Sequence, residues 1–270
     1  MDTRLEGKRC LITGGNSGIG LAIAKALAQE GVRLAIASRD DYPEALAELR
    51  GMGSEVEFIQ VDLRAEMAVV EAVKMALRRW DGLDLYVNNA AIARHEPVTR
   101  VTTQAFYEAM DINLGACVWA CREISQHMLQ RQAGSILIIG STVRICPAYG
   151  EAFYRISKVG LKMYMETLAV ELAPFGIRVN MITPGYFPTR LTAGMSAKHQ
   201  ALLRGEIPLR RPGEPMECGF AASFLLSDHL SSYITGADLL VDGGLALRPL
   251  KLFNDQEILS LNQSRLDGES

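Results

Sequence analysis

Tyr154 and Lys158 are the residues whose types and spacing point most directly to chemistry. They lie four residues apart in residues 151–173, a segment predicted to be helical, and residues at this spacing share one face of a helix. A free tyrosine titrates near pH ~10, and a cation one turn away lowers that pKa by favouring the phenolate. The pair could therefore exchange a proton with a substrate near neutral pH, and the alternative is an ordinary surface Tyr–Lys pair.

Two further polar residues are expected close to this pair. Ser141 follows a predicted strand at residues 135–139, and its hydroxyl could hold a substrate carbonyl beside the phenol. Asn113 lies within residues 103–130, a helical pattern in which asparagine is a poor helix former. An inserted side chain or water at Asn113 would bend that helix, and a core asparagine with a satisfied amide is the alternative.

A glycine-rich turn near the start of the chain indicates a site for a dinucleotide. Residues 10–12 form a short apolar run typical of a buried strand, then come Gly14, Gly18 and Gly20, and a helical pattern ends at Gly31. The backbone N–H groups of such a turn and the N-terminus of the next helix attract a pyrophosphate. The spacing differs from GxGxxG, and a purely structural turn is the alternative.

Strands and helices alternate along the chain, which predicts an α/β fold with a parallel sheet and helices on both faces. The predicted strands are residues 10–12, 33–38, 56–61, 83–87, 135–139, 177–182 and 238–241. No linker or internal repeat interrupts the pattern before residue 184, so one doubly wound domain is expected. Ligands of such sheets bind beyond the carboxyl ends of the strands, where this chain carries Thr13, Ser38, Asp62, Asn88, Ser141 and Thr183.

Composition narrows the class of protein. The chain has 270 residues, of which 49% are hydrophobic, and a net charge of −3, so no nucleic-acid partner is expected. Residues 1–9 are polar, and no apolar run is as long as a membrane span, so neither a secretory signal nor a membrane partner is expected. Five cysteines form no CxxC pair. We therefore expect a cytoplasmic protein with reduced thiols and no metal ion.

Together these motifs resemble the short-chain dehydrogenase/reductase family. The matching elements are Thr13-Gly14-x-x-x-Gly18-Ile19-Gly20, Asn88-Asn89-Ala90, Asn113, Ser141, Tyr154-x-x-x-Lys158, Pro184-Gly185 and Val241-Asp242-Gly243-Gly244. They occur in the family's order between residues 5 and 244. The resemblance implies a Rossmann-type domain with a seven-stranded parallel sheet, over residues 1–245. It also implies nicotinamide-dependent hydride transfer between a ketone and a secondary alcohol.

The resemblance also implies roles for individual residues. Tyr154 would be the general acid in reduction and the base in oxidation, and Lys158 would lower its pKa and hold the nicotinamide ribose. Ser141 would position the carbonyl, and Asn113 would support a water that relays protons to Lys158. Ala91 stands where the family usually has glycine, and its methyl group is expected to be tolerated. The expected cofactor-binding residues are Gly14, Asn16, Ser17, Gly18, Ile19, Gly20, Ser38, Arg39, Asp62, Leu63, Asn89, Ala90, Ala91, Tyr154, Lys158, Pro184, Gly185, Phe187 and Thr189.

The residues after the second predicted strand favour NADP(H) over NAD(H). An acidic residue at that position would bind a ribose 2′-hydroxyl and repel a 2′-phosphate, but this chain has Ser38 followed by Arg39. Arginine can bind a phosphate with two parallel hydrogen bonds. Asp40 follows and could weaken the effect, and the glycine turn lacks a basic residue, so NAD(H) is the alternative.

The substrate pocket is expected between residues 93–96, 143–149 and 186–212, with residues 186–215 as a lid. Three substrate classes fit: a 3-oxoacyl thioester, a sugar or polyol used with NAD(H), and a broad range of carbonyls. A non-catalytic NADP-binding regulator is the alternative of a different class. The resemblance implies a homotetramer, with a dimer second. Residues 246–270 extend the chain and could reach a neighbouring subunit or cover the pocket.

Overall fold

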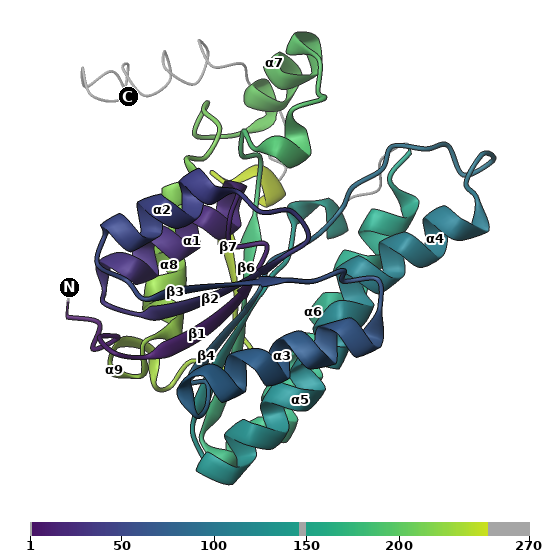
Figure 1. The fold of residues 1–270 in the computed structure, drawn as a ribbon. Helices are drawn as coiled ribbons and strands as arrows, with labels where there is room; N and C mark the ends of the chain where they lie inside the picture. The colour runs from purple at the N-terminus through teal and green to yellow at the C-terminus, as the bar shows by residue number, and fades with distance from the viewer. Residues whose placement is uncertain (1, 146–149, 248–270) are drawn as a thin grey trace, which may run out of the picture.

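The computed structural model describes residues 2–145 and 150–247, and they form a parallel sheet between two helical layers (Figure 1). Within these residues seven strands pair in the order β3-β2-β1-β4-β5-β6-β7, and every pair is parallel. The predicted doubly wound fold is confirmed. The strands are β1 (Arg9–Thr13), β2 (Arg33–Ser38), β3 (Val56–Gln60), β4 (Leu85–Asn88), β5 (Gly134–Ile139), β6 (Ile177–Pro184) and β7 (Asp238–Val241).

Each face of the sheet has its own core because successive side chains of a strand point to opposite faces. Cys10 and Ile12 pack with α1, α2 and α8, whereas Leu11 between them packs with α3, α5 and α6. Both faces are covered, so the strands read as continuous apolar runs. The helices are α1 (Gly18–Gln29), α2 (Pro43–Gly51), α3 (Glu66–Trp80), α4 (Thr103–Met110), α5 (Ala116–Arg131), α6 (Ala152–Leu172), α7 (Ala197–Glu206), α8 (Pro215–Leu226) and α9 (Asp228–Ser231).

Two segments differ in detail from the sequence-based prediction. The helix expected over residues 103–130 is divided into α4 and α5 by a π-helical turn, Asp111–Gly115, so the expected bend at Asn113 is confirmed. The polar segment before residue 215 contains α7, which stands away from the sheet (Figure 1). No helix in the described part of the chain combines the length and apolar character needed to cross a membrane.

The strand order places the polar residues at one edge. The chain runs from β1 outward to β3 and then returns to β4 on the other side of β1, so the two halves of the sheet diverge between β1 and β4. Ligands of such folds bind at this point. Thr13 and Asn88 end the two strands, and Ser141 follows β5 on the same edge.

Arg178, on strand β6, connects the C-terminal end of α8 to the sheet by hydrogen bonds. Its side chain is 8% exposed and donates to the carbonyls of Leu225 and Leu226, at 2.8 and 3.2 Å, in the last turn of α8. It also donates to Ser231 and pairs with Asp228 at 2.9 Å. A cation at this place satisfies carbonyls that the helix leaves unpaired and interacts favourably with the helix dipole.

We therefore expect the substitution Arg178→Met to lower the free energy of unfolding by about 3 kcal/mol, because it removes the guanidinium donor of the Leu226 carbonyl and one of the two side-chain donors of the Leu225 carbonyl. Arg78→Met is the control, since Arg78 is exposed and pairs with Glu71 on the surface of α3, where such pairs contribute about 0–1 kcal/mol. Urea unfolding followed by circular dichroism at one protein concentration measures both. Equal losses in the two variants would contradict this role of Arg178.

Candidate active site

Tyr154 and Lys158 lie on α6 at the carboxyl edge of the sheet, as the sequence predicts. The Lys158 ammonium group lies 5.8 Å from the centre of the Tyr154 ring. Lys158 is 2% exposed, and its Nζ donates to the Ile139 carbonyl at the end of β5, at 2.9 Å. The ammonium group is therefore fixed by the strand that also leads to Ser141.

Burial governs the acid–base properties of this pair. Burial raises the pKa of Tyr154, while a hydrogen bond with Ser141 acts in the opposite direction. Among the nearby charges, Glu151 raises this pKa and Arg155 lowers it. Burial also lowers the pKa of Lys158 to about 8. The expected effect of Lys158 on the phenol stays a prediction.

Ser141 reaches Tyr154 because β5 ends just before it. Its backbone is extended, with φ −170°, and its hydroxyl accepts a hydrogen bond from the Val143 N–H at 3.3 Å. The hydroxyl also lies close enough to the phenol of Tyr154 to act against the rise in its pKa. Ser141 is buried, with 8% of its surface exposed, whereas Tyr154 is half-buried.

Asn113 joins two elements of the site through a fully satisfied amide. Its Oδ1 accepts from the Ile92 N–H at 2.8 Å, and its Nδ2 donates to the Ile92 carbonyl at 3.0 Å and to Ser157 Oγ at 3.1 Å. Ser157 in turn donates to the Tyr154 carbonyl at 2.7 Å. The bend and the satisfied amide, which the sequence offers as alternatives, occur together. Sequence reasoning missed Ser157, although it lies next to Lys158.

The glycine turn is shaped by close packing of backbone on backbone. A Cβ atom at Gly20 would lie 2.2 Å from the Gly14 carbonyl oxygen and 2.4 Å from Nδ2 of Asn89. That Nδ2 donates to the carbonyls of Thr13 and Gly14, both at 3.1 Å. Glycine is therefore required at position 20 by contact between the turn and α1. Gly14 is needed for a further reason, since its φ of +64° favours glycine.

The N-terminus of α1 is suited to an anion. Ser17 precedes the helix without capping it through its side chain, and among the described residues the first turn carries no acidic group. The first N–H groups of a helix have no partner within it, and they attract phosphate when no side chain binds them. An open cavity of about 330 Å³ lies over this end, and its walls include Asn16, Ser17, Gly18, Tyr42 and Arg190.

Arg39 and Asp62 lie at the ends of β2 and β3, and both have ionic partners nearby. Arg39 pairs with Asp40 through two hydrogen bonds of 3.1 and 3.0 Å. Asp62 accepts from the guanidinium and from the N–H of Arg64, which lowers its pKa to about 2. The carboxylate of Asp62 is thus ionised and already bound to a cation.

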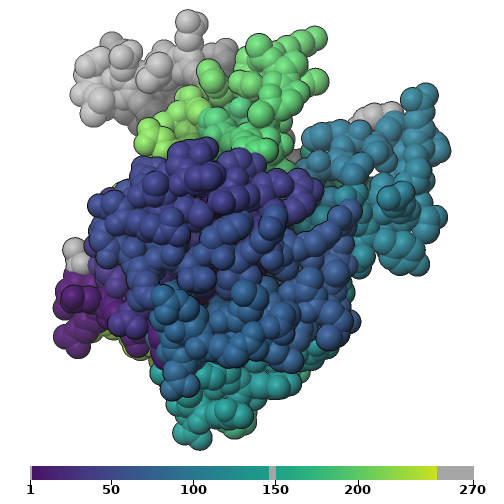
Figure 2. Space-filling model, in the orientation of Figure 1, coloured from purple at the N-terminus to yellow at the C-terminus, as the bar shows by residue number. Residues whose placement is uncertain are grey.

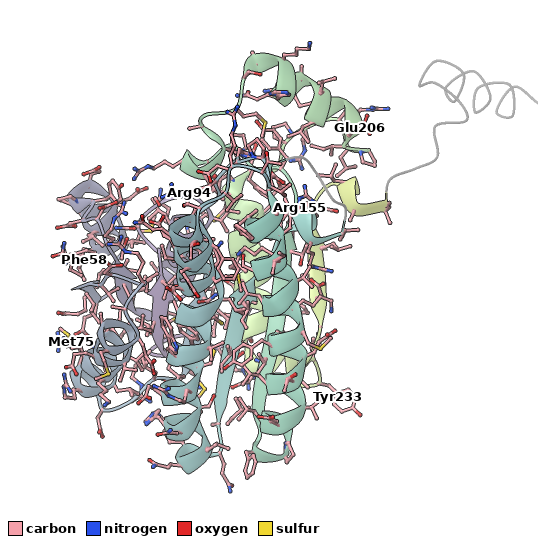
Figure 3. All side chains as sticks on the ribbon, turned by 90° about the vertical axis from the view of Figure 1, so that its right-hand side faces the viewer. Phe58, Met75, Arg94, Arg155, Glu206 and Tyr233 are labelled. Atoms are coloured by element: carbon pink, nitrogen blue, oxygen red, sulfur yellow. The ribbon has the colours of Figure 1, made fainter. Side chains whose placement is uncertain are left out.

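A second, narrow hollow of about 20 Å³ lies beside Tyr154. Its lining is mostly apolar and includes Ile92, Ala105, Ala109 and Phe153. Figure 2 shows the segments with α4 and α7 as two projections from the body of the molecule. Arg94 and Arg155 lie at the same end of the helical layer (Figure 3).

Three of the residues expected around the substrate have other partners. Arg144 pairs with Asp238 on β7, Arg190 stacks on the ring of Tyr42 at 4.8 Å, and His95 lies 3.5 Å from Glu151. Arg155, which sequence reasoning missed, pairs with Glu151 and donates to the Val143 carbonyl, so it ties α6 to the turn after Ser141. Residues 146–149, including Tyr149, lie outside the described part.

Among the expected cofactor residues, Phe187 and Thr189 follow β6. Phe187 is 3% exposed, and Thr189 lies next to Gly18, where an added Cβ would be 3.4 Å away. The chain after Pro184 therefore crosses from β6 to the glycine turn. Residues 2–145 and 150–247 bring together no group of three His, Cys, Asp or Glu side chains that could hold a metal ion.

Comparison with known proteins agrees with this geometry. A family model described as enoyl-(acyl carrier protein) reductase matches residues 14–246. The 3-oxoacyl-[acyl-carrier-protein] reductase FabG of Chlamydia pneumoniae is 34% identical over 247 residues, which cover 91% of this chain and 99% of that protein. The 3beta-hydroxysteroid dehydrogenase 1 of Eggerthella lenta is 34% identical over 251 residues, which cover 91% of this chain and 96% of its own.

Solved structures give the same result. A gluconate 5-dehydrogenase from Burkholderia cenocepacia, in complex with NADP and tartrate, has a TM-score of 0.85 and 30% identity, over 91% of this chain and 98% of that one. A 3-ketoacyl-(acyl-carrier-protein) reductase from Brucella melitensis, complexed with NADH, has a TM-score of 0.82 and 31% identity, over 90% and 99%. This chain belongs to the short-chain dehydrogenase/reductase family.

Proposed function

We propose that this protein is an NADP(H)-dependent oxidoreductase that interconverts a ketone and a secondary alcohol. The observation that carries the proposal is the proximity of buried Ser141, buried Lys158 and half-buried Tyr154, at the edge where the glycine turn also lies. The uncapped N-terminus of α1 and the cavity above it fit the phosphates of a dinucleotide. Bound nicotinamide dinucleotide supplies or accepts the hydride.

The side chains supply the proton and the orientation. Tyr154 donates its phenolic proton to the carbonyl oxygen in reduction and takes it back in oxidation, and Ser141 donates a hydrogen bond to the same oxygen. Lys158, whose pKa of about 8 leaves it charged at neutral pH, holds the cofactor ribose and favours the phenolate. Asn113 supports the proton relay by fixing Ile92 and Ser157, because its own amide has no free group.

The substrate is best described as a carbonyl compound with apolar groups next to the carbonyl. The residues around the hollow beside Tyr154 are mostly apolar, which favours a 3-oxoacyl chain or a general ketone over a polyol. Relatives named as 3-oxoacyl-[acyl-carrier-protein] reductases and as a hydroxysteroid dehydrogenase support this reading. A sugar or polyol dehydrogenase using NAD(H) is the second candidate: the structural likeness to a gluconate 5-dehydrogenase supports this substrate class, and the likeness to a reductase complexed with NADH supports this cofactor.

We assign residues 1–245 to the cofactor-binding and catalytic domain, with residues 186–215 as a lid. A hydrogen bond of 2.9 Å from the Gly213 N–H to the Tyr186 carbonyl joins the two ends of this segment, and α7 projects between them. Residues 246–270 are the extension, and its part from residue 248 lies outside the described residues. We place the protein in the cytoplasm, since its four described cysteines are buried free thiols.

Replacing Tyr154 by phenylalanine tests the catalytic assignment against a non-catalytic regulator. We expect Tyr154→Phe to lower kcat by at least about 100-fold, because the general acid is lost, and to change the dissociation constant of the cofactor by less than about twofold. Tyr107→Phe makes the same change at an exposed tyrosine of α4 and should leave kcat unaltered. Turnover is measured by the absorbance of reduced nicotinamide, and turnover that survives in Tyr154→Phe refutes the assignment.

The choice of cofactor is tested at Arg39. We expect Arg39→Ala to raise KM for NADPH about tenfold, the value of one lost charged hydrogen-bond pair, and to leave KM for NADH nearly unchanged. Initial-rate titrations with the two cofactors measure the difference. A lower KM for NADH than for NADPH in the unaltered enzyme would reverse the choice.

We also propose a homotetramer, with a dimer as the alternative. The outer face of α6 carries an exposed apolar stripe, Ile156, Val159, Met163 and Val170, at helical spacing. A second exposed apolar set lies on α8 and near β7: Phe220, Tyr233, Leu239 and Leu240. Two self-complementary surfaces on one chain give a tetramer, whereas one gives a dimer.

A charged substitution in the apolar stripe on α6 tests whether this stripe forms a subunit interface. We expect Met163→Glu to reduce the molar mass measured by light scattering after gel filtration, because it buries a carboxylate in the interface. Met67→Glu introduces the same charge on the exposed face of α3 and should keep the mass of the unaltered protein. A monomeric unaltered protein, or an unchanged mass in Met163→Glu, argues against this interface.

A further inference from the structure

Asp40 places a carboxylate against Arg39, at the adenosine end of the cofactor cleft. The carboxylate accepts two parallel hydrogen bonds from the Arg39 guanidinium, at 3.1 and 3.0 Å. Both side chains are open to solvent, with exposed fractions of 70% for Arg39 and 47% for Asp40. The position that a phosphate would take on Arg39 is thus taken by an anion of the protein itself.

Arg190 lines, together with Tyr42, the cavity over the N-terminus of α1. It follows Thr189 in the segment that crosses over Gly18, and its guanidinium stacks on the ring of Tyr42 at 4.8 Å. Tyr42 is two residues from Asp40. The hydrogen bonds with Arg39 are the main cause that lowers the pKa of Asp40, and the charge of Arg190 adds a smaller effect in the same direction. Two arginines from different parts of the chain therefore act on one carboxylate.

The backbone around Asp40 is held independently of these side chains. Asn16, which is 3% exposed, donates from its Nδ2 to the Asp40 carbonyl at 2.6 Å. Gln60 donates to the Arg39 carbonyl at 3.1 Å. A ligand can therefore displace the carboxylate by turning side chains alone, without moving the main chain.

We propose that Arg39 and Arg190 together form the binding site for the 2′-phosphate of NADP(H), and that the Asp40 carboxylate occupies this site until the phosphate displaces it. The inference rests on the proposed function and adds to it a second phosphate ligand and an internal competitor. The phosphate carries about two negative charges and three acceptor oxygens, so it binds two guanidinium groups better than a carboxylate does. The displaced Asp40 side chain turns to solvent, and an exposed pair of this kind costs only about 0.2–1 kcal/mol to break.

Two fragments of the cofactor test binding at the adenosine end of the cleft without any hydride transfer. The probes are adenosine 2′,5′-bisphosphate and adenosine 5′-monophosphate, which differ only in the 2′-phosphate, titrated into the full chain by calorimetry. We expect Asp40→Asn to bind the bisphosphate about two- to fivefold more tightly, with binding of the monophosphate unchanged, because the competitor is removed. We expect Arg190→Ala to bind the bisphosphate about fivefold or more weakly, with the monophosphate changed less than about twofold.

Matched controls separate local contact from long-range charge. Asp41→Asn removes the same charge one residue away, at an exposed side chain, and Lys74→Ala removes a positive charge on α3. Equal effects of Asp40→Asn and Asp41→Asn would overturn the role of Asp40, and equal effects of Arg190→Ala and Lys74→Ala would overturn that of Arg190.

The outcome also distinguishes this inference from the proposed function. If Arg39→Ala weakens the bisphosphate while the Asp40 and Arg190 variants behave like their controls, the preference for NADP(H) stands and only the inference fails. If the unaltered protein binds both fragments equally and Arg39→Ala changes neither, the preference for NADP(H) itself is refuted.

Discussion

The amide of Asn113 makes three hydrogen bonds in a place that water does not reach, and the arrangement of the proposed catalytic residues depends on them. Through Ile92 it holds the chain that leaves β4, and through Ser157 it holds the first turns of α6. An unpaired amide there would cost free energy, so the helix before α5 widens into a π turn to bring the side chain into line. The catalytic helix and the sheet edge are thus fixed to each other by one side chain.

The glycine turn has a second constraint of the same kind. Asn89 closes the turn by donating to two of its carbonyls, and Gly20 lets α1 pack directly on that bonded group. The turn after β1 is therefore rigid before any ligand arrives. Asn89 and Asn113 stand at the two ends of the chain segment that leaves β4, so the proposed cofactor site and proton-transfer site share a common frame.

Much of this arrangement could be predicted from the sequence because it is encoded locally. Buried parallel strands read as apolar runs, and the spacing of Tyr154 and Lys158 places them on one helical face. The poor helix propensity of Asn113 marked the bend. Asp40, the partner of Arg39, is its neighbour in the sequence, but the partner of Arg190 could not be predicted, since only the folded chain brings Tyr42 next to it. The link from Ser157 to Asn113 was missed for the same reason, because the two residues lie 44 positions apart.

The hydrogen bond from the buried Asn16 side chain to the Asp40 carbonyl has a consequence for how this protein can change. This hydrogen bond holds the loop after β2 by a main-chain carbonyl. The side chains at positions 39 and 40 therefore contribute little to the stability of the fold. Residues in such a loop can be exchanged one at a time while the fold is retained. Nucleotide selectivity in this chain is therefore open to rapid divergence or deliberate redesign, without compensating changes in the core.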